Sequence, residues 1–105
     1  MAVVRVSGPR ALAAVQNLAG AGVAERRAAL RTLRRADGTH LDTAVVLVFP
    51  EGQSFTGETV AEFQVHGSIA VVNALLFSAD RRPGAFHWFV SLRPQSWNVH
   101  VFVRL

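Results

Sequence analysis

The segment from Phe55 to Gly67 constrains the fold most, because it is typical of a turn, then a β-strand, then a turn into a helix. Gly57 and Gly67 are interpreted as turn glycines with positive φ. Side chains alternate between the two faces of a strand. One face is therefore predicted to be core, formed by Ala61, Phe63 and Val65. The other face carries Val60, Glu62, Gln64 and His66. A carboxylate, an amide and an imidazole in a row indicate a face that is either solvated or part of a site.

Two segments show apolar residues at helical spacing. The first begins at Ser7-Gly8-Pro9, where the serine is predicted to cap the first turn and proline loses no hydrogen bond, and it ends at Gly20 and Gly22. The second begins with Ser68 as its cap and ends near Ala79. The residues predicted to face inward are Leu12, Val15, Leu18 and Ala19 in the first helix, and Ile69, Val72, Leu75 and Leu76 in the second.

Three further strands are predicted over residues 2–6, 28–33 and 43–49, with a turn at Asp37-Gly38 and a stop at Pro50. The nearly continuous β-branched run at 43–49 favours a central strand covered on both faces or lying at an interface. The predicted order is β-α-β-β-β-α. It indicates a two-layer α+β domain in which a mixed sheet packs with two helices.

Composition sets the remaining bounds. Half of the 105 residues are hydrophobic, so one packed domain is expected; cysteine is absent, which excludes disulfides. There is no membrane-length apolar run and no signal-peptide pattern at the start, so a cytoplasmic protein is expected. The formal charge is +4, every basic residue is an arginine, and five of them lie within residues 26–35. These arginines indicate either a solvated hairpin or a phosphate-contacting patch, although the segment lacks the interleaved aromatics of a single-strand binder.

Several chemistries are not supported by the sequence. A phosphate-loop NTPase needs a glycine-rich loop with a lysine, and this chain contains no lysine, so GTP hydrolysis is not expected of it. There is no Gly-x-Ser-x-Gly elbow. The histidines show no metal-ligand spacing, so no metal site is predicted; they are His40, His66, His87 and His100. No catalytic residue is predicted either.

The run FPEGQSFTGETVAEFQVHG, residues 49–67, resembles the N-terminal domain of the MnmE (TrmE) family of tRNA-modification GTPases. That family has a Ser-Phe-Thr-Gly-Glu-Asp run, a strand carrying a glutamate, and a His-Gly-Gly ahead of a helix. Supporting pieces stand in the same order along the chain: Val3-Val4-Arg5-Val6-Ser7-Gly8-Pro9, Asp37-Gly38, and Arg82-Pro83-Gly84-Ala85-Phe86. The resemblance covers residues 2–86 and ends before any helical or GTPase domain.

The resemblance implies a module that binds a tetrahydrofolate derivative, such as 5-formyltetrahydrofolate, and forms a homodimer. In the intact family it serves one-carbon transfer to a tRNA wobble uridine, together with a flavin-dependent partner. The implied cofactor-binding residues are Arg5 and Glu62; the family's later lysine contact has no counterpart here. The alternative for Arg5 and Glu62 is a plain ion pair across the sheet, and His66 is interpreted as a hydrogen-bonded turn histidine. Alternative functions are an arginine-rich RNA-binding module and a ligand-free dimerisation fragment.

Residues 87–105 depart from the resemblance. Both tryptophans lie there, and the last nine residues alternate like a strand. The hypothesis is a divergent tail, produced by a frameshift or a truncated reading frame, attached to a domain over residues 1–86. The aromatic residues Phe86, Trp88 and Phe89 are interpreted as packing, or as apolar surface that promotes association.

Overall fold

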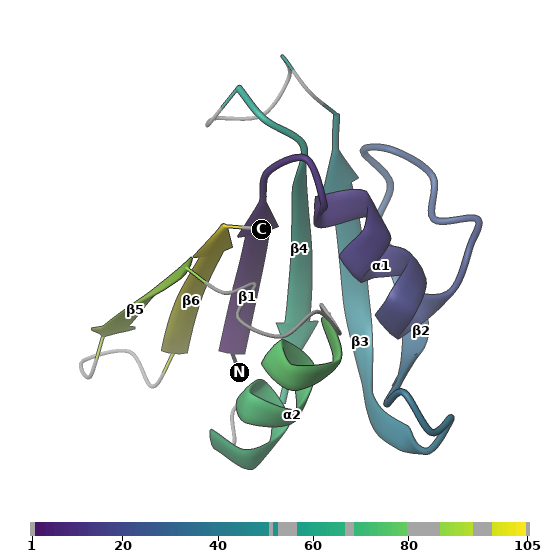
Figure 1. Ribbon diagram of the computed structural model, residues 1–105, viewed down its shortest axis with the longest axis vertical. Coiled ribbons are helices and arrows are strands. Elements are labelled where there is room, and N and C mark those ends of the chain that lie inside the picture. Colours follow the sequence, from purple (N-terminus) through teal and green to yellow (C-terminus); the bar gives the residue numbers. More distant parts are fainter. Residues whose placement is uncertain are drawn as a thin grey trace.

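The structure is a computed structural model that describes residues 2–50, 52, 57–66, 69–79, 87–93 and 98–104. Two helices lie against a twisted sheet (Figure 1). The elements are β1 (Ala2–Ser7), α1 (Ala11–Ala19), β2 (Ala29–Arg34), β3 (His40–Phe49), β4 (Val60–Val65), α2 (Ile69–Ala79), β5 (His87–Arg93) and β6 (Asn98–Arg104). The predicted α+β class and the order β-α-β-β-β-α are confirmed, with β5 and β6 following.

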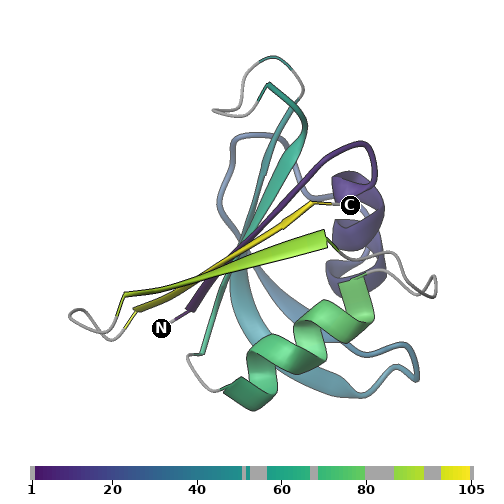
Figure 2. The same cartoon turned by 60° about the vertical axis from the view of Figure 1, so that its left-hand side comes forward.

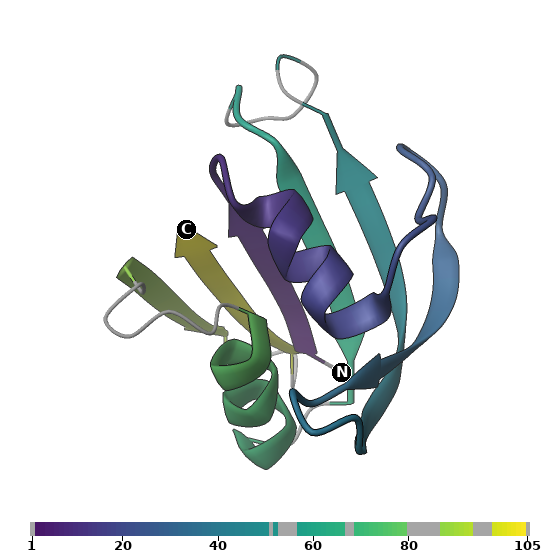
Figure 3. The same ribbon diagram turned by 45° about the vertical axis from the view of Figure 1, so that its right-hand side comes forward.

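The sheet has the strand order β2-β3-β4-β1-β6-β5. Its first four strands pair antiparallel, whereas β6 pairs parallel to β1, so the sheet is mixed as predicted. The first strand is therefore internal, with β4 on one side and β6 on the other. Figure 3 shows α1 lying across β1 and β4, and β2 forming the edge beyond it.

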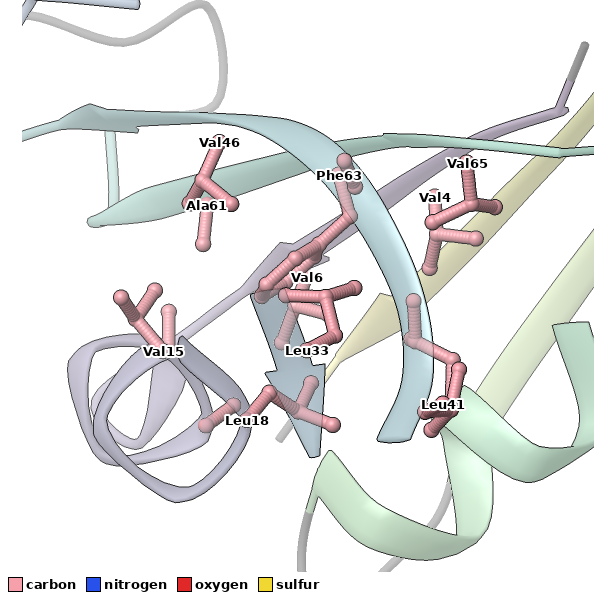
Figure 4. Packing of buried hydrophobic residues seen from close by; sticks show 14 of the residues in the cluster. Val4, Val6, Val15, Leu18, Leu33, Leu41, Val46, Ala61, Phe63 and Val65 are labelled. Atoms are coloured by element: carbon pink, nitrogen blue, oxygen red, sulfur yellow. The ribbon is translucent and has the colours of Figure 1, made fainter. Parts of the chain in front are cut away.

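Both helices pack on the same side of the sheet, which Figure 2 shows edge-on. The core lies between these two layers and is built from alternate strand residues, among them Val4, Val6, Ala61 and Phe63 (Figure 4). Phe63 is fully buried, and its neighbours Glu62 and Gln64 point the other way. The predicted division of β4 into a core face and a polar face is confirmed at these positions.

The start of α1 differs from the prediction. Ser7 is the last residue of β1, and the helix begins at Ala11 with Arg10 at the N-cap position and no side-chain cap. The intervening turn is held by Gly8, whose N–H donates to the carbonyl oxygen of Thr59 at 3.1 Å. The predicted serine cap is therefore wrong, because pairing with β4 keeps Ser7 in the strand. The predicted end is right, since Gly20 has φ +80° at the C-cap.

The buried stripe of α1 is rotated relative to the prediction. Val15 and Leu18 are buried as expected, but Leu12 is 48% exposed and Ala11 and Ala14 are buried in its place. Alanines on the inward face let the helix backbone approach the sheet closely. Apolar spacing alone did not distinguish this face from the one containing Leu12.

The third strand is longer than predicted and begins at His40. Its burial alternates: Ala44, Val46 and Val48 are buried under the helices, and the residues between them are half-buried or exposed. The central position between β2 and β4 is confirmed. The helices cover only one face of this strand, so it is not covered on both faces. Its β-branched run corresponds instead to a strand that is paired with a neighbour on both edges.

The C-terminal half contains both confirmed and untested predictions. Val72 and Leu75 of α2 are buried as expected, while Ser68 and the side chains of Ile69 and Leu76 lie outside the described residues. The strand expected at the end of the chain is β6. The division of the chain at residue 86 and the frameshift hypothesis remain predictions. Among the described segments, no helix is both long and apolar enough to cross a membrane.

Candidate functional site

The candidate site lies on the face of the sheet that the helices leave uncovered. Register places Arg5 of β1 directly opposite Glu62 of the antiparallel strand β4, and Gln64 lies two residues farther along β4 on the same face. Residues with this spacing share one side of a sheet. Strand alternation therefore brings the two residues that the resemblance implied into direct contact.

The three side chains form one hydrogen-bonded group. Arg5 Nε donates to Glu62 Oε1 at 2.8 Å, and Gln64 Nε2 donates to Glu62 Oε2 at 3.1 Å. The Glu62 side chain is only 12% exposed and that of Arg5 is 34% exposed. The plain ion pair considered from the sequence is therefore present. A carboxylate has about four lone-pair sites, so Glu62 retains acceptor capacity beyond these two bonds.

Apolar residues flank this polar group. On β3, Leu47 lies opposite Glu62 and Val45 lies opposite Gln64; on β1, Val3 lies opposite Gln64. All three are half-buried. The uncovered face thus combines a nearly buried carboxylate with apolar side chains on both neighbouring strands. Such a combination suits a ligand with a flat ring and hydrogen-bonding edges.

A second polar cluster lies where β3 and β4 adjoin α2. Asp42 Oδ2 accepts the backbone N–H of His66 at 2.9 Å, and Asp42 Oδ1 lies 2.7 Å from His66 Nδ1. Burial raises the pKa of the Asp42 carboxyl, but hydrogen bonds from His66 and from the backbone of Thr43 outweigh it, so the pKa lies below its ordinary value. The His66 side chain is 79% exposed.

His66 is hydrogen-bonded, as the sequence indicated, and it follows β4 directly; the turn expected there extends into residues outside the described ones. It contacts Asp42 and not the Arg5–Glu62 pair. Sequence reasoning missed Asp42; the available signal was a carboxylate at an inward position of an otherwise apolar strand. Gly57 has φ +80° as predicted for a turn glycine, and Gly67 lies outside the described residues. Within the part of the chain that the structure describes, no three His, Asp or Glu side chains are grouped so that they could hold a metal ion.

Comparison with known proteins identifies the family of the chain. The sequence profile described as "GTP-binding protein TrmE N-terminus" matches residues 1–86, most of the chain. The chain belongs to this family. Its strand glutamate and strand arginine thus lie within the matched region.

Relatives of this family named "tRNA modification GTPase MnmE" share high identity with the chain. The protein of Phenylobacterium zucineum is 55% identical over 76 residues, which is 72% of this chain and 17% of that protein. The protein of Rhizobium meliloti is 49% identical over 87 residues, 83% of this chain and 20% of that protein. The chain thus corresponds to about a fifth of the length of these relatives.

Proposed function

We propose that the chain is the tetrahydrofolate-binding and homodimerisation module of a tRNA wobble-uridine modification GTPase. In this proposal it binds a 5-formyltetrahydrofolate-like ligand in the cytoplasm. The one-carbon transfer, the tRNA and the flavin-dependent partner belong to the activity of the full-length enzyme. Membership of the TrmE N-terminus family and the printed names of the relatives support the tRNA-modification setting.

The observation that carries the folate proposal is the Arg5–Glu62–Gln64 group. The pterin ring of a folate presents an amino group and a ring N–H side by side, and a carboxylate accepts two such donors in one fixed orientation. Glu62 has this capacity, and the two hydrogen bonds it already accepts fix its position. Half-buried Leu47 and Val45 beside it supply apolar contact for a ring. The residues present therefore fit the group.

The affinity is expected to be lower than for a family member that has the additional lysine. This chain contains no lysine. A hydrogen bond to a charged group contributes about 1.5–3 kcal/mol, so its loss corresponds to about 10- to 100-fold weaker binding.

The test is thermal unfolding with and without 5-formyltetrahydrofolate. At about 100 times the dissociation constant, a ligand specific for the native state stabilises it by about 2.7 kcal/mol. We expect this shift in the wild type and in Glu25→Gln, which removes an exposed carboxylate from a loop. We expect none in Glu62→Gln, which keeps the shape of the side chain. A cooperatively folded wild type without a shift, or an equal shift in Glu62→Gln, would refute the proposal.

Self-association is proposed through the uncovered sheet face. Leu30 of β2 lies opposite Val45 on that face and is 73% exposed. Leu30 extends the half-buried apolar side chains of Val45 and Leu47 on the same face, and contiguous apolar surface of this kind favours contact with a second surface. Sedimentation velocity should show a dimer that Leu30→Glu converts to monomer. Phe77 on α2 is 82% exposed on the helix layer, so Phe77→Glu is the matched control and should leave the dimer intact. The reverse pattern would place the interface on the helices.

A further inference from the structure

We propose that the edge of the sheet formed by β2 and its two flanking loops is a binding surface for the phosphates of base-paired RNA. We call this the arginine edge and define it as residues 21–40. It contains five arginines against two carboxylates, Glu25 and Asp37, so it carries +3 of the formal charge of +4. The choice of RNA among polyanions rests on the proposed tRNA-modification setting; the surface itself rests on charge and geometry.

Three of the guanidinium groups are held in place by neutral partners. Arg31 donates to the carbonyl oxygens of Ala21 and Gly22, Arg34 Nη1 donates to Gly38 O at 3.1 Å, and Arg35 Nη1 donates to His40 O at 2.6 Å. A carbonyl oxygen orders the side chain without neutralising its charge. A guanidinium has five N–H donors, so each group keeps donors for a phosphate.

The two carboxylates of the arginine edge leave it with a net positive charge. Asp37 lies in the β2–β3 turn, where its Oδ1 accepts the backbone N–H of Thr39 at 3.0 Å and the Thr39 hydroxyl at 2.7 Å. These hydrogen bonds, with a smaller contribution from the charge of Arg35, lower the pKa of Asp37. Glu25 is exposed in the loop before β2. Asp37 thus serves the turn that positions Arg34 and Arg35.

The arginines are spread along the length of the edge strand. The Arg26 backbone N–H donates to Val48 O, Arg31 lies opposite Ala44, and Arg34 lies opposite His40. Val48 and His40 are eight positions apart on β3, which corresponds to about 27 Å at ~3.4 Å per residue. Duplex DNA carries one phosphate per strand for every ~3.4 Å of axis, and the spacing in base-paired RNA is of the same order. The edge is therefore long enough to meet several phosphates at once.

The composition of the edge favours a base-paired RNA over a single strand. Residues 21–40 contain no phenylalanine, tryptophan or tyrosine. Proteins that hold single strands stack bases on aromatic side chains, whereas duplex RNA is bound through its backbone and shape. Arginines without aromatics therefore match the backbone of a stem.

The experiment measures binding of a fluorescent tRNA transcript by anisotropy between 50 and 200 mM salt. Replacing Arg34 or Arg35 by glutamine should reduce the slope of log K against log salt by about one. Arg34→Lys keeps the charge and should preserve the slope. Arg93→Gln removes one charge at the end of β5, the opposite edge of the sheet, and should also preserve it.

Three results would overturn the proposal. The first is no tRNA binding, and the second is a salt slope that does not change when Arg34 or Arg35 is replaced by glutamine. The third is equal affinity for the tRNA transcript, for a single-stranded oligonucleotide of the same length and for polyglutamate. The folate shift is measured on the same variants. Because it depends on Glu62 and not on Arg34, a retained folate shift with no RNA binding refutes the arginine edge alone. A lost folate shift with retained RNA binding refutes the folate site alone.

Discussion

Removal of the Asp42 carboxylate tests how the residue after β4 is held against β3. In Asp42→Ala, the backbone N–H of His66 loses its acceptor and the imidazole loses its partner. A hydrogen bond to a charged acceptor contributes about 1.5–3 kcal/mol, and the Asp42 side chain is only 10% exposed. We expect the variant to lose about 2–4 kcal/mol, which for a domain of this size lowers Tm by roughly 10–25 °C.

His66→Ala is the matched control because it removes only the ring contact. The ring is largely exposed, and polar side-chain contacts at exposed positions contribute about 0–1 kcal/mol. The backbone N–H can still donate to Asp42 in this variant. Urea unfolding followed by circular dichroism should therefore show a much smaller loss than in Asp42→Ala. Equal losses in the two variants would show that the ring, and not the backbone hydrogen bond, holds the turn.

The pH dependence gives an independent check. Because the pKa of Asp42 is lowered in the folded state, its stabilising contribution is fully present above the unfolded value of about 3.8 and is lost as the pH falls through the lower folded value. The difference in stability between wild type and Asp42→Ala should therefore be smaller below pH 4 than at pH 5. A difference that grows as the pH falls from 5 to below 4 would refute the reasoning.

Three further predictions follow from packing and backbone geometry. Leu18→Ala should lower the free energy of unfolding in urea by about 2–5 kcal/mol, because Leu18 is only 2% exposed. Leu12→Ala should lower it by less than about 1 kcal/mol, because Leu12 is 48% exposed. Similar losses in the two variants would contradict the observed rotation of α1. Gly38 has φ +85°, and a Cβ added there would meet open space. Gly38→Ala should therefore lower the free energy of unfolding by about 1–2 kcal/mol through backbone strain alone, and Gly38→Asn should lower it by less. Equal losses in the two variants would show that the turn has changed shape. Amide hydrogen exchange should show protection along both edges of β1, since β6 pairs with it; rapid exchange along one edge would contradict that pairing.

The polar face of β4 could be predicted because strand alternation is local. Once Phe63 is assigned to the core, Glu62 and Gln64 must face the opposite side. The pairing of Glu62 with Arg5 is not local, since the two residues lie 57 positions apart and meet only through the register of β1 against β4. The family resemblance named both residues, but periodicity did not place them together.

Asp42 shows the limit of the same reasoning. Alternation along β3 places Asp42 with buried Ala44 and Val46, where a carboxylate is costly without partners. Its partners come from His66, 24 residues away, on a turn that follows another strand. The sequence showed a polar residue at an inward position but not the donor that stabilises it. The Ser7 cap failed for a related reason, because pairing with β4 overrode a local capping signal.

The two proposed ligand surfaces occupy different strands of one sheet. The Arg5–Glu62 group lies on β1 and β4, whereas the arginine edge lies on β2 and its loops, with β3 between them. Two strand spacings of ~4.8 Å separate β2 from β4, so the surfaces are close but share no described side-chain contact. Substitutions at sites without shared partners are expected to be additive. Folate should therefore leave the salt slope for RNA unchanged. A slope that changes with folate would mean that the ligand and the RNA phosphates use a common set of arginines, and the separation inferred from the strand order would be wrong.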